Sequence, residues 1–352
     1  MNPQHLIPVA DTIPVHWGWL QFLLILTFTL HLLAMNAMLG SGIITLIREF
    51  IQGDQSQQIN KEVSLKLPYT IAFTVNMGVA PLLFLQVLYG HFIYTSSILM
   101  AVYWISIILV LILAYYAAYI YDFKFDALGE ARKIFIALCV ILLLWTGFIF
   151  SNNMVLMIQP EKWTAYFRNP FGTLLNLKDP MLLPRYLHFV VASVAVGGLC
   201  QAIVYTLRQS KQGNVDAVRS GLNWFSGATC VQLAVGIWFL VSLPKDKMML
   251  FMGQGTLHTT VLILGIFGSI AALITASKGR VWMTSALTLA TIIAMVLARD
   301  LLRAAFLTPY FSPADLKVAP EYSPMVVFLV SFAAGIGIIV YMLKLAASGK
   351  EG

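Results

Sequence analysis

The chain has 352 residues, of which 59% are hydrophobic and only 11% are charged, and its formal net charge is +7. Apolar stretches of about 20 residues recur along nearly the whole length, which excludes a large soluble domain and predicts membrane-spanning helices. The basic residues are scattered through short polar segments, so the net charge does not indicate nucleic-acid binding.

The sequence predicts an all-α, polytopic membrane helix bundle with about nine transmembrane helices in a single integral membrane domain, 1–352. The expected spans are 17–47, 68–92, 97–121, 133–157, 183–208, 219–243, 249–277, 281–307 and 323–347. The first sixteen residues lack a basic start and an apolar core, so we expect no cleavable signal peptide. The three cysteines are isolated and no C-x-x-C-H sequence occurs, so neither a disulfide framework nor covalently attached haem is expected.

The basic residues of the predicted loops favour one orientation of the bundle. With the N-terminus outside, the inner segments carry thirteen lysines and arginines and the outer segments carry nine. Because basic residues are enriched in cytoplasmic segments, this excess predicts that the N-terminus lies outside and the C-terminus inside.

Three histidines lie within predicted spans, where an imidazole is a functional candidate and a possible axial ligand of haem iron. His31 is about fourteen residues into the first span, near the bilayer midplane. His188 and His258 are about five and nine residues into spans that start outside. At 1.5 Å per residue their depths are roughly 8 and 14 Å, so both histidines could coordinate one ring between them.

Small residues follow His188 on the same predicted helix. Such residues let a flat cofactor, or another helix, approach the backbone closely. The stretch is therefore equally consistent with a cofactor site and with a packing helix whose histidine hydrogen-bonds a neighbour. The small residues are Ala192, Ser193, Ala195, Gly197 and Gly198.

Polar and aromatic residues gather at the predicted outer ends of the spans. Arg299 and Arg303 are spaced i,i+4, and Asp300 and Arg303 are spaced i,i+3. This group is a candidate clamp for haem propionates or a wall of a quinone site, and the alternative is an interfacial salt bridge with snorkelling arginines. Trp163 and Arg168 belong to an aromatic segment, 158–182, that is typical of an interfacial belt but can also cover a quinone headgroup.

Arg185 and Asp300 complete the set of candidate quinone-site residues. Several methionines near the ends of spans are possible soft ligands of a metal, although methionine is also a common filler of irregular cores. They are Met154, Met157, Met248, Met249 and Met252.

Four stretches together resemble, in order, subunit I of the cytochrome bd quinol oxidases, over about residues 15–210. In that resemblance His188 takes the place of the histidine that ligates the low-spin b haem, and His31 that of another haem-ligating histidine. The stretches are Trp19–Gly40, Phe73–Gly90, Phe150–Pro160 and Arg185–Gly198.

The resemblance implies one or two b haems, quinol as substrate, and a multi-pass protein of the bacterial inner membrane, surrounded by lipid, with its N-terminus outside. If a haem is bound, we expect Arg299 and Arg303 to neutralise its propionates, an expectation that comes from their spacing and position and not from the resemblance. The resemblance divides the chain into a cytochrome-bd-like core, 15–210, and a divergent helical remainder, 211–352.

The sequence departs from that family in ways that bear on its activity. The family's low-spin haem takes a methionine as second ligand; here His258 is the predicted second ligand, with Met249 or Met252 as alternatives. Ala298–Phe311 lacks the glutamate that ligates a high-spin haem in the family. Phe84 and Gln86 stand where the family has carboxylates, and the quinol-binding loop is shortened, so we expect no oxygen reduction by this chain alone.

The sequence therefore predicts a b-type cytochrome subunit that oxidises quinol from the quinone pool near the outer face. It would pass the electrons to a c-type cytochrome or another redox subunit. Two alternatives stay open. One is a cofactor-free, quinone-binding membrane anchor of a respiratory complex. The other is a transporter, which would be expected to show broken helices and paired repeats that are not evident here.

Overall fold

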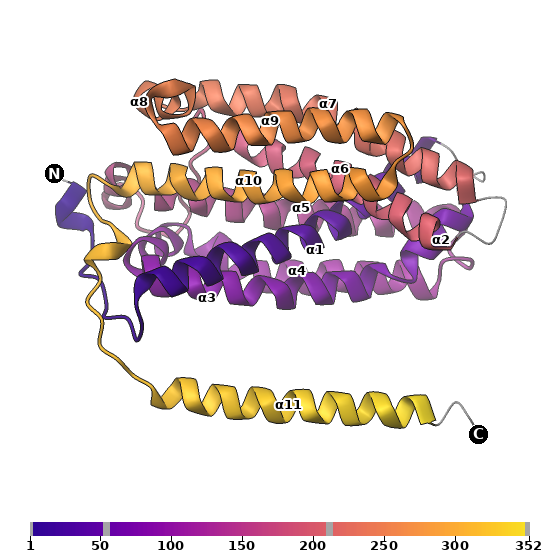
Figure 1. Cartoon of the computed structure of the whole chain (residues 1–352), viewed down its shortest axis with the longest axis horizontal. Helices are drawn as coiled ribbons and strands as arrows, with labels where there is room; N and C mark the ends of the chain where they lie inside the picture. Colours follow the sequence, from indigo (N-terminus) through magenta and orange to yellow (C-terminus); the bar gives the residue numbers. More distant parts are fainter. Residues whose placement is uncertain (1–2, 52–56, 209–213, 349–352) are drawn as a thin grey trace.

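The computed structural model describes residues 3–51, 57–208 and 214–348 as an all-helical bundle, which confirms the predicted fold class (Figure 1). Eight of the described helices are long and apolar enough to cross a membrane. They are α1 (Trp17–Ile51), α3 (Leu67–Leu99), α4 (Ala101–Phe123), α5 (Arg132–Met157), α6 (Leu182–Leu207), α7 (Asn214–Ser242), α9 (Thr256–Ser277) and α10 (Val281–Leu307).

The remaining helical elements are short or lie outside the bundle. They are α2 (Gln57–Ser64), α8 (Lys245–Met249), a π-turn at Leu250–Gln254, α11 (Ser323–Ser348), and 3-10 turns at Pro3–Leu6, Gly129–Ala131, Pro160–Phe167 and Pro313–Asp315. We call the end of the bundle at which α1 begins the N-side; the sequence predicts that it faces outward. The helices run along the long axis, with α7 and α9 at one side, α3 and α4 at the other, and α1, α5, α6 and α10 between them (Figure 1).

Glycines bring α1, α6 and α7 into close contact. A Cβ on Gly40 of α1 would overlap the carbonyl oxygen of Ser193 on α6, and a Cβ on Gly197 would lie 2.5 Å from the carbonyl carbon of Gly40. A Cβ on Gly198 would lie 2.7 Å from the carbonyl oxygen of Gly221 on α7. In lipid, where helix association depends on packing rather than on hydrophobic burial, these contacts fix the position of α6.

Buried polar groups join helices at the opposite end, the C-side. The Glu49 carboxylate of α1 accepts hydrogen bonds from Arg132 Nε of α5 and from the Tyr121 hydroxyl of α4, both at 2.9 Å. Arg48 donates to the Ser220 hydroxyl of α7 at 3.0 Å. These charges are buried but hydrogen-bonded, as buried ionic groups must be.

One predicted span, 249–277, is wrong at its start. The chain forms α8 and a π-turn there, and α9 begins only at Thr256. Gly253 has a φ of 117°, a value that favours glycine, and Gly255 is extended at the helix N-cap. The two glycines break the helix, so His258 is only the third residue of α9 and lies less deep than its predicted nine residues.

Helix α11 lies apart from the bundle, on the side of α3 and α4 (Figure 1). Its described side chains are exposed, except for partly exposed Gly335. The segment that leads to it is attached to the N-terminal segment, because Ile13 N donates to Lys317 O and Ala319 N donates to Ile13 O, each at 2.9 Å. The start of α11 is therefore held at the N-side.

Candidate functional site

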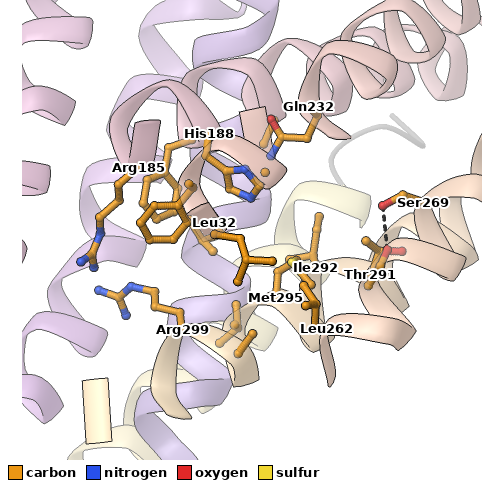
Figure 2. A pocket seen from close by; sticks show the side chains of 18 of the residues that line it. Leu32, Arg185, His188, Gln232, Leu262, Ser269, Thr291, Ile292, Met295 and Arg299 are labelled. Atoms are coloured by element: carbon orange, nitrogen blue, oxygen red, sulfur yellow. Dashed lines mark hydrogen bonds between the residues drawn. The ribbon is translucent and has the colours of Figure 1, made fainter. Parts of the chain in front are cut away.

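A cavity of about 300 Å³ lies between α6, α7, α9 and α10 and also touches α1. Its size falls in the range of small-molecule and cofactor sites. Its walls are mostly apolar and include Phe189, Phe225, Phe251, Leu262 and Ile292. A few polar side chains from different helices converge on it (Figure 2).

Three arginines form the N-side end of this cavity. Arg185 of α6 and Arg303 of α10 are buried, and Arg299 of α10 is half-buried. Figure 2 shows the guanidinium groups of Arg185 and Arg299 on the same side of the cavity. The Arg299 Nε atom and the Arg303 Nε and Nη1 atoms are buried and have no hydrogen-bond partner.

The acidic groups beside these arginines do not balance their charge. Arg303 pairs with Asp300, which also accepts a 2.7 Å hydrogen bond from Gln21 Nε2 of α1. Asp179, near Arg185, is already bonded to Lys162 and to the Met181 backbone N–H. Within the described residues, this end of the cavity therefore carries an excess of buried positive charge. Such an arrangement is costly unless a ligand supplies negative charge.

The rings of two aromatic residues lie against the guanidinium groups of Arg299 and Arg303. The Arg299 guanidinium carbon lies 4.2 Å from the Phe28 ring centroid, and that of Arg303 lies 4.5 Å from the Tyr89 centroid. Stacking on an aromatic face is a cation–π contact that stabilises a guanidinium group and orients it. The arginines are thus held in place while several of their N–H groups stay available.

His188 lies one turn farther into the bundle than Arg185 and lines the cavity. Its Nδ1 atom is buried and has no hydrogen-bond partner in the described part of the chain. The Nδ1–Cε1 edge faces α7, since a Cβ on Gly236 would lie 3.3 Å from Cε1 and 3.6 Å from Nδ1. The imidazole is therefore packed against a glycine at one edge and faces the cavity.

Met295 also lines the cavity, and the sequence interpretation did not single it out. It lies four residues before Arg299 on the same face of α10. Helix α6 runs away from the N-side and α10 runs toward it. At 1.5 Å per residue, His188 is therefore about 4.5 Å farther from the N-side than Arg185, and Met295 is about 6 Å farther from it than Arg299. The backbone positions of His188 and Met295 therefore lie at similar depths on different helices, and the Met295 thioether packs against Gly265 of α9, where an added Cβ would lie 3.3 Å from Sδ. Met295, Arg299 and Arg303 follow one another at intervals of four residues on α10, and this spacing could have identified Met295 from the sequence.

The structure does not place His258 or His31 in this cavity. The His258 ring packs edge-on against Phe251, with 5.1 Å between ring centroids, and it also touches Gly255. His31 lies against Gly78 of α3, and its Nδ1 atom is 3.2 Å from the Thr74 carbonyl oxygen. Of the candidate methionines, Met154 and Met157 line the cavity, whereas Met248, Met249 and Met252 do not.

Two of the four quinone-site candidates lie at the cavity, and the other two lie elsewhere. Arg185 lines the cavity and Asp300 is bonded to Arg303 beside it. Trp163 is buried, and its indole N–H donates to the Leu156 carbonyl at 2.9 Å, which is a packing role. Arg168 lines a separate depression of about 410 Å³ on the N-side.

The small residues after His188 divide between two roles. Ala192 and Ala195 line the cavity, whereas Gly197 and Gly198 form the close contacts with α1 and α7. Close helix packing is thus observed at Gly197 and Gly198, whereas a cofactor beside Ala192 and Ala195 stays a prediction.

The donor set limits what the cavity can hold. Within the described residues there is no group of three or more His, Cys, Asp or Glu side chains that could bind a bare metal ion. One imidazole, three thioethers and three arginines in an apolar cavity suit a flat apolar molecule that carries acidic groups. No protein-family model and no curated protein sequence matches this chain.

Proposed function

We propose that this cavity binds a b-type haem and that the chain is a membrane cytochrome subunit, which takes electrons from quinol and passes them to a partner redox protein. One observation carries the proposal. An apolar cavity contains an imidazole with an unpartnered nitrogen, and its N-side end holds an excess of buried arginines. A haem matches each of these features, since it has an apolar macrocycle, two carboxylates at one edge, and an iron that accepts nitrogen and sulfur ligands.

The residues of the cavity fit such a group in a definite way. Arg185, Arg299 and Arg303 would hold the two propionates through charge-assisted hydrogen bonds. His188 would ligate the iron from α6 and Met295 from α10, since these two residues lie at similar depths below the arginines. This assignment replaces His258 as the second ligand and agrees with the methionine of the cytochrome bd family that the sequence resembles.

The proposed ligands define the chemistry that the site supports. A haem supplies one-electron transfer, and the protein supplies its position and electrostatics. His188 and Met295 would both hold the iron in this proposal, so the haem would supply electron transfer rather than oxygen binding. The proposal places one haem in the cavity and gives His31, outside it, no ligand role.

The N-side also offers groups for the protons of a quinol. Asp300 accepts from Gln21, and the Tyr89 hydroxyl lies 3.5 Å from the Gln21 side-chain oxygen. Asp300 retains 20% exposure of its side chain, so it connects the buried arginines with the surroundings. Quinol from the quinone pool would be oxidised near this group in the bacterial inner membrane. Its electrons would leave through the haem to a c-type cytochrome or another redox subunit.

A second candidate function is quinone binding without haem. The cavity reaches the lipid-facing surface at Ile237 and Ile266, whose side chains are 61% and 38% exposed. An isoprenoid tail could enter there, while arginine N–H groups hold a quinone carbonyl. The chain would then be a quinone-binding anchor subunit.

Haem and quinone analysis of the purified protein tests the two candidates together. We expect about one non-covalent b haem per chain, identified after extraction as its pyridine complex. Protein that is free of haem but carries one tightly bound quinone would favour the anchor instead. Protein that holds neither would contradict both proposals and support the transporter alternative.

A further inference from the structure

We propose that Gln232 of α7 positions the haem ligand His188, by accepting a hydrogen bond from the His188 Nδ1–H with its side-chain carbonyl oxygen. This inference rests on the proposed haem function. It concerns a residue that the sequence pattern did not single out and that touches neither the proposed propionates nor the iron.

The first step is the protonation state of His188. A histidine that ligates iron through one nitrogen is neutral and carries its proton on the other nitrogen. Here Nδ1 is the buried nitrogen on the α7 side, and it has no partner in the described part of the chain. Nε2 is therefore the nitrogen left for the iron, and the Nδ1–H needs an acceptor, because metal-ligating histidines almost always donate their second N–H.

The second step is the acceptor. The Gln232 Oε1 atom is also buried and unpartnered, and Gln232 lines the same cavity. Gln232 lies one turn from Gly236 on the same face of α7, and Gly236 is the residue that meets the Nδ1–Cε1 edge of His188. Figure 2 shows the Gln232 amide beside the imidazole, with its nitrogen nearer the ring than its oxygen. An orphan donor and an orphan acceptor thus lie on neighbouring helices, and turning the amide over would bring its oxygen to the Nδ1 side.

The third step compares Gln232 with the cavity's other polar side chains. Thr229, Thr291 and Ser269 each donate their hydroxyl to a carbonyl one turn earlier in their own helix, at 2.7–2.8 Å, which orients these hydroxyl groups along their own helices. The Asn36 Oδ1 atom of α1 is a second buried acceptor without a partner in the described residues, but the Nδ1–Cε1 edge of His188 faces Gly236 of α7, the helix that carries Gln232. Gln232 is free to rotate its amide toward His188, since its oxygen has no competing partner in the described residues.

The predicted hydrogen bond has a measurable electronic effect. A carbonyl that accepts the Nδ1–H makes the imidazole a more basic ligand and holds its plane in one orientation. A more basic ligand favours ferric iron, so the bond lowers the midpoint potential of the haem. Removing the acceptor should raise the potential and loosen the ring.

The test compares Gln232→Leu, Gln232→Asn and Ser242→Ala in the full-length, haem-loaded protein. Leucine keeps the volume without the acceptor, and asparagine withdraws the amide by one methylene. Ser242→Ala also removes a polar group from α7, but Ser242 does not line the cavity and its hydroxyl donates to the Phe239 carbonyl within α7. The readouts are the midpoint potential, the low-temperature EPR signal of the ferric haem and haem retention on dilution.

We expect both Gln232 variants to have a higher midpoint potential and a changed EPR signal, with roughly tenfold weaker haem retention, while Ser242→Ala matches the wild type. If Gln232→Leu does not assemble, Gln232→Asn decides. A wild-type potential and EPR signal in the Gln232 variants that assemble would overturn this inference and leave the haem assignment intact. A wild-type protein without haem would overturn the proposed function, and this inference with it.

Discussion

Buried guanidinium groups are the costliest feature of this protein unless something compensates their charge. Arg185, Arg299 and Arg303 meet at one end of an apolar cavity, and the carboxylate bonded to them there, within the described residues, is Asp300. A membrane protein retains such groups where they bind or move charge. At the scale of single residues, the haem proposal explains why they are there.

Replacing Arg299 by Gln tests the role of this excess charge. The change leaves the Arg303–Asp300 pair in place but removes one guanidinium group from the cavity. We expect the loss of a charge-assisted hydrogen bond of about 1.5–3 kcal/mol, equivalent to a roughly tenfold to hundredfold weaker retention of haem. Haem titration of the depleted protein measures this change.

The matched control for Arg299 is Arg280→Gln, since Arg280 is exposed on the C-side between α9 and α10. It should leave haem retention unchanged. Equal retention in both variants would favour the salt-bridge interpretation of the Arg299 region.

Met295→Leu tests the second axial ligand. Leucine has a similar volume, so packing should change little, but it lacks the sulfur that would coordinate iron. We expect the haem to convert from low spin to high spin, seen in EPR and in the visible spectrum. Met154→Leu, which changes another methionine of the same cavity, should remain low spin. A low-spin haem in Met295→Leu would remove Met295 from the ligand set.

The sequence identified His188 and the three arginines as candidates, because charges and imidazoles are unusual in apolar spans. It did not single out Met295, since methionine is a common core residue and its four-residue spacing from Arg299 was the one sequence signal that pointed to it. Pairing His188 with His258 relied on counting residues along an uninterrupted helix. Gly253 and Gly255 delay the start of α9 to Thr256, and this is a backbone effect that hydropathy does not reveal.

At the scale of helices, the position of the proposed ligand depends on close contacts between α1 and α6. Gly197→Ala would place a methyl group against the backbone of Gly40, in a contact that neither helix can relieve without shifting. We expect a loss of about 1–3 kcal/mol in stability, observed as a lower thermal unfolding midpoint in detergent. The haem spectrum should be lost at a lower temperature as well.

Gly227→Ala is the control for this change. Gly227 is also in a membrane-spanning helix, α7, but a Cβ there would meet nothing within 4 Å. Alanine should therefore be neutral or stabilising by about 0.5–1 kcal/mol. If Gly197→Ala unfolds at the same temperature as Gly227→Ala, the close contact does not limit the packing of α6.

The all-helical fold was predictable because about 20 apolar residues in lipid have few alternatives to a helix, although nine spans were expected and eight of the described helices are long and apolar enough to span. The contacts between helices were not, since all spans are apolar on most sides and periodicity does not distinguish lipid from a neighbouring helix. The last span illustrates the limit. Helix α11 has the hydropathy of a span over Val326–Met342, but it lies outside the bundle, which composition alone does not indicate.

At the scale of the whole molecule, the orientation in the membrane decides which compartment the arginine end faces. Single cysteines at Arg168 and Lys278 test it, because both residues are exposed and lie at opposite ends of the bundle. From the charge bias of the loops, a membrane-impermeant maleimide should label Arg168→Cys in intact cells and Lys278→Cys only after permeabilisation. The opposite pattern would place the proposed quinol oxidation on the inner side.

The reduced-minus-oxidised visible spectrum of His188→Ala tests the central claim most directly, when it is compared with the wild type and with His31→Ala and His258→Ala. The wild type should show the spectrum of a low-spin b haem, because His188 and Met295 would occupy both axial positions. His188→Ala should lose it, while His31→Ala and His258→Ala should keep it, since neither side chain lines the cavity. A full low-spin spectrum in His188→Ala would contradict the assignment of the haem to this cavity.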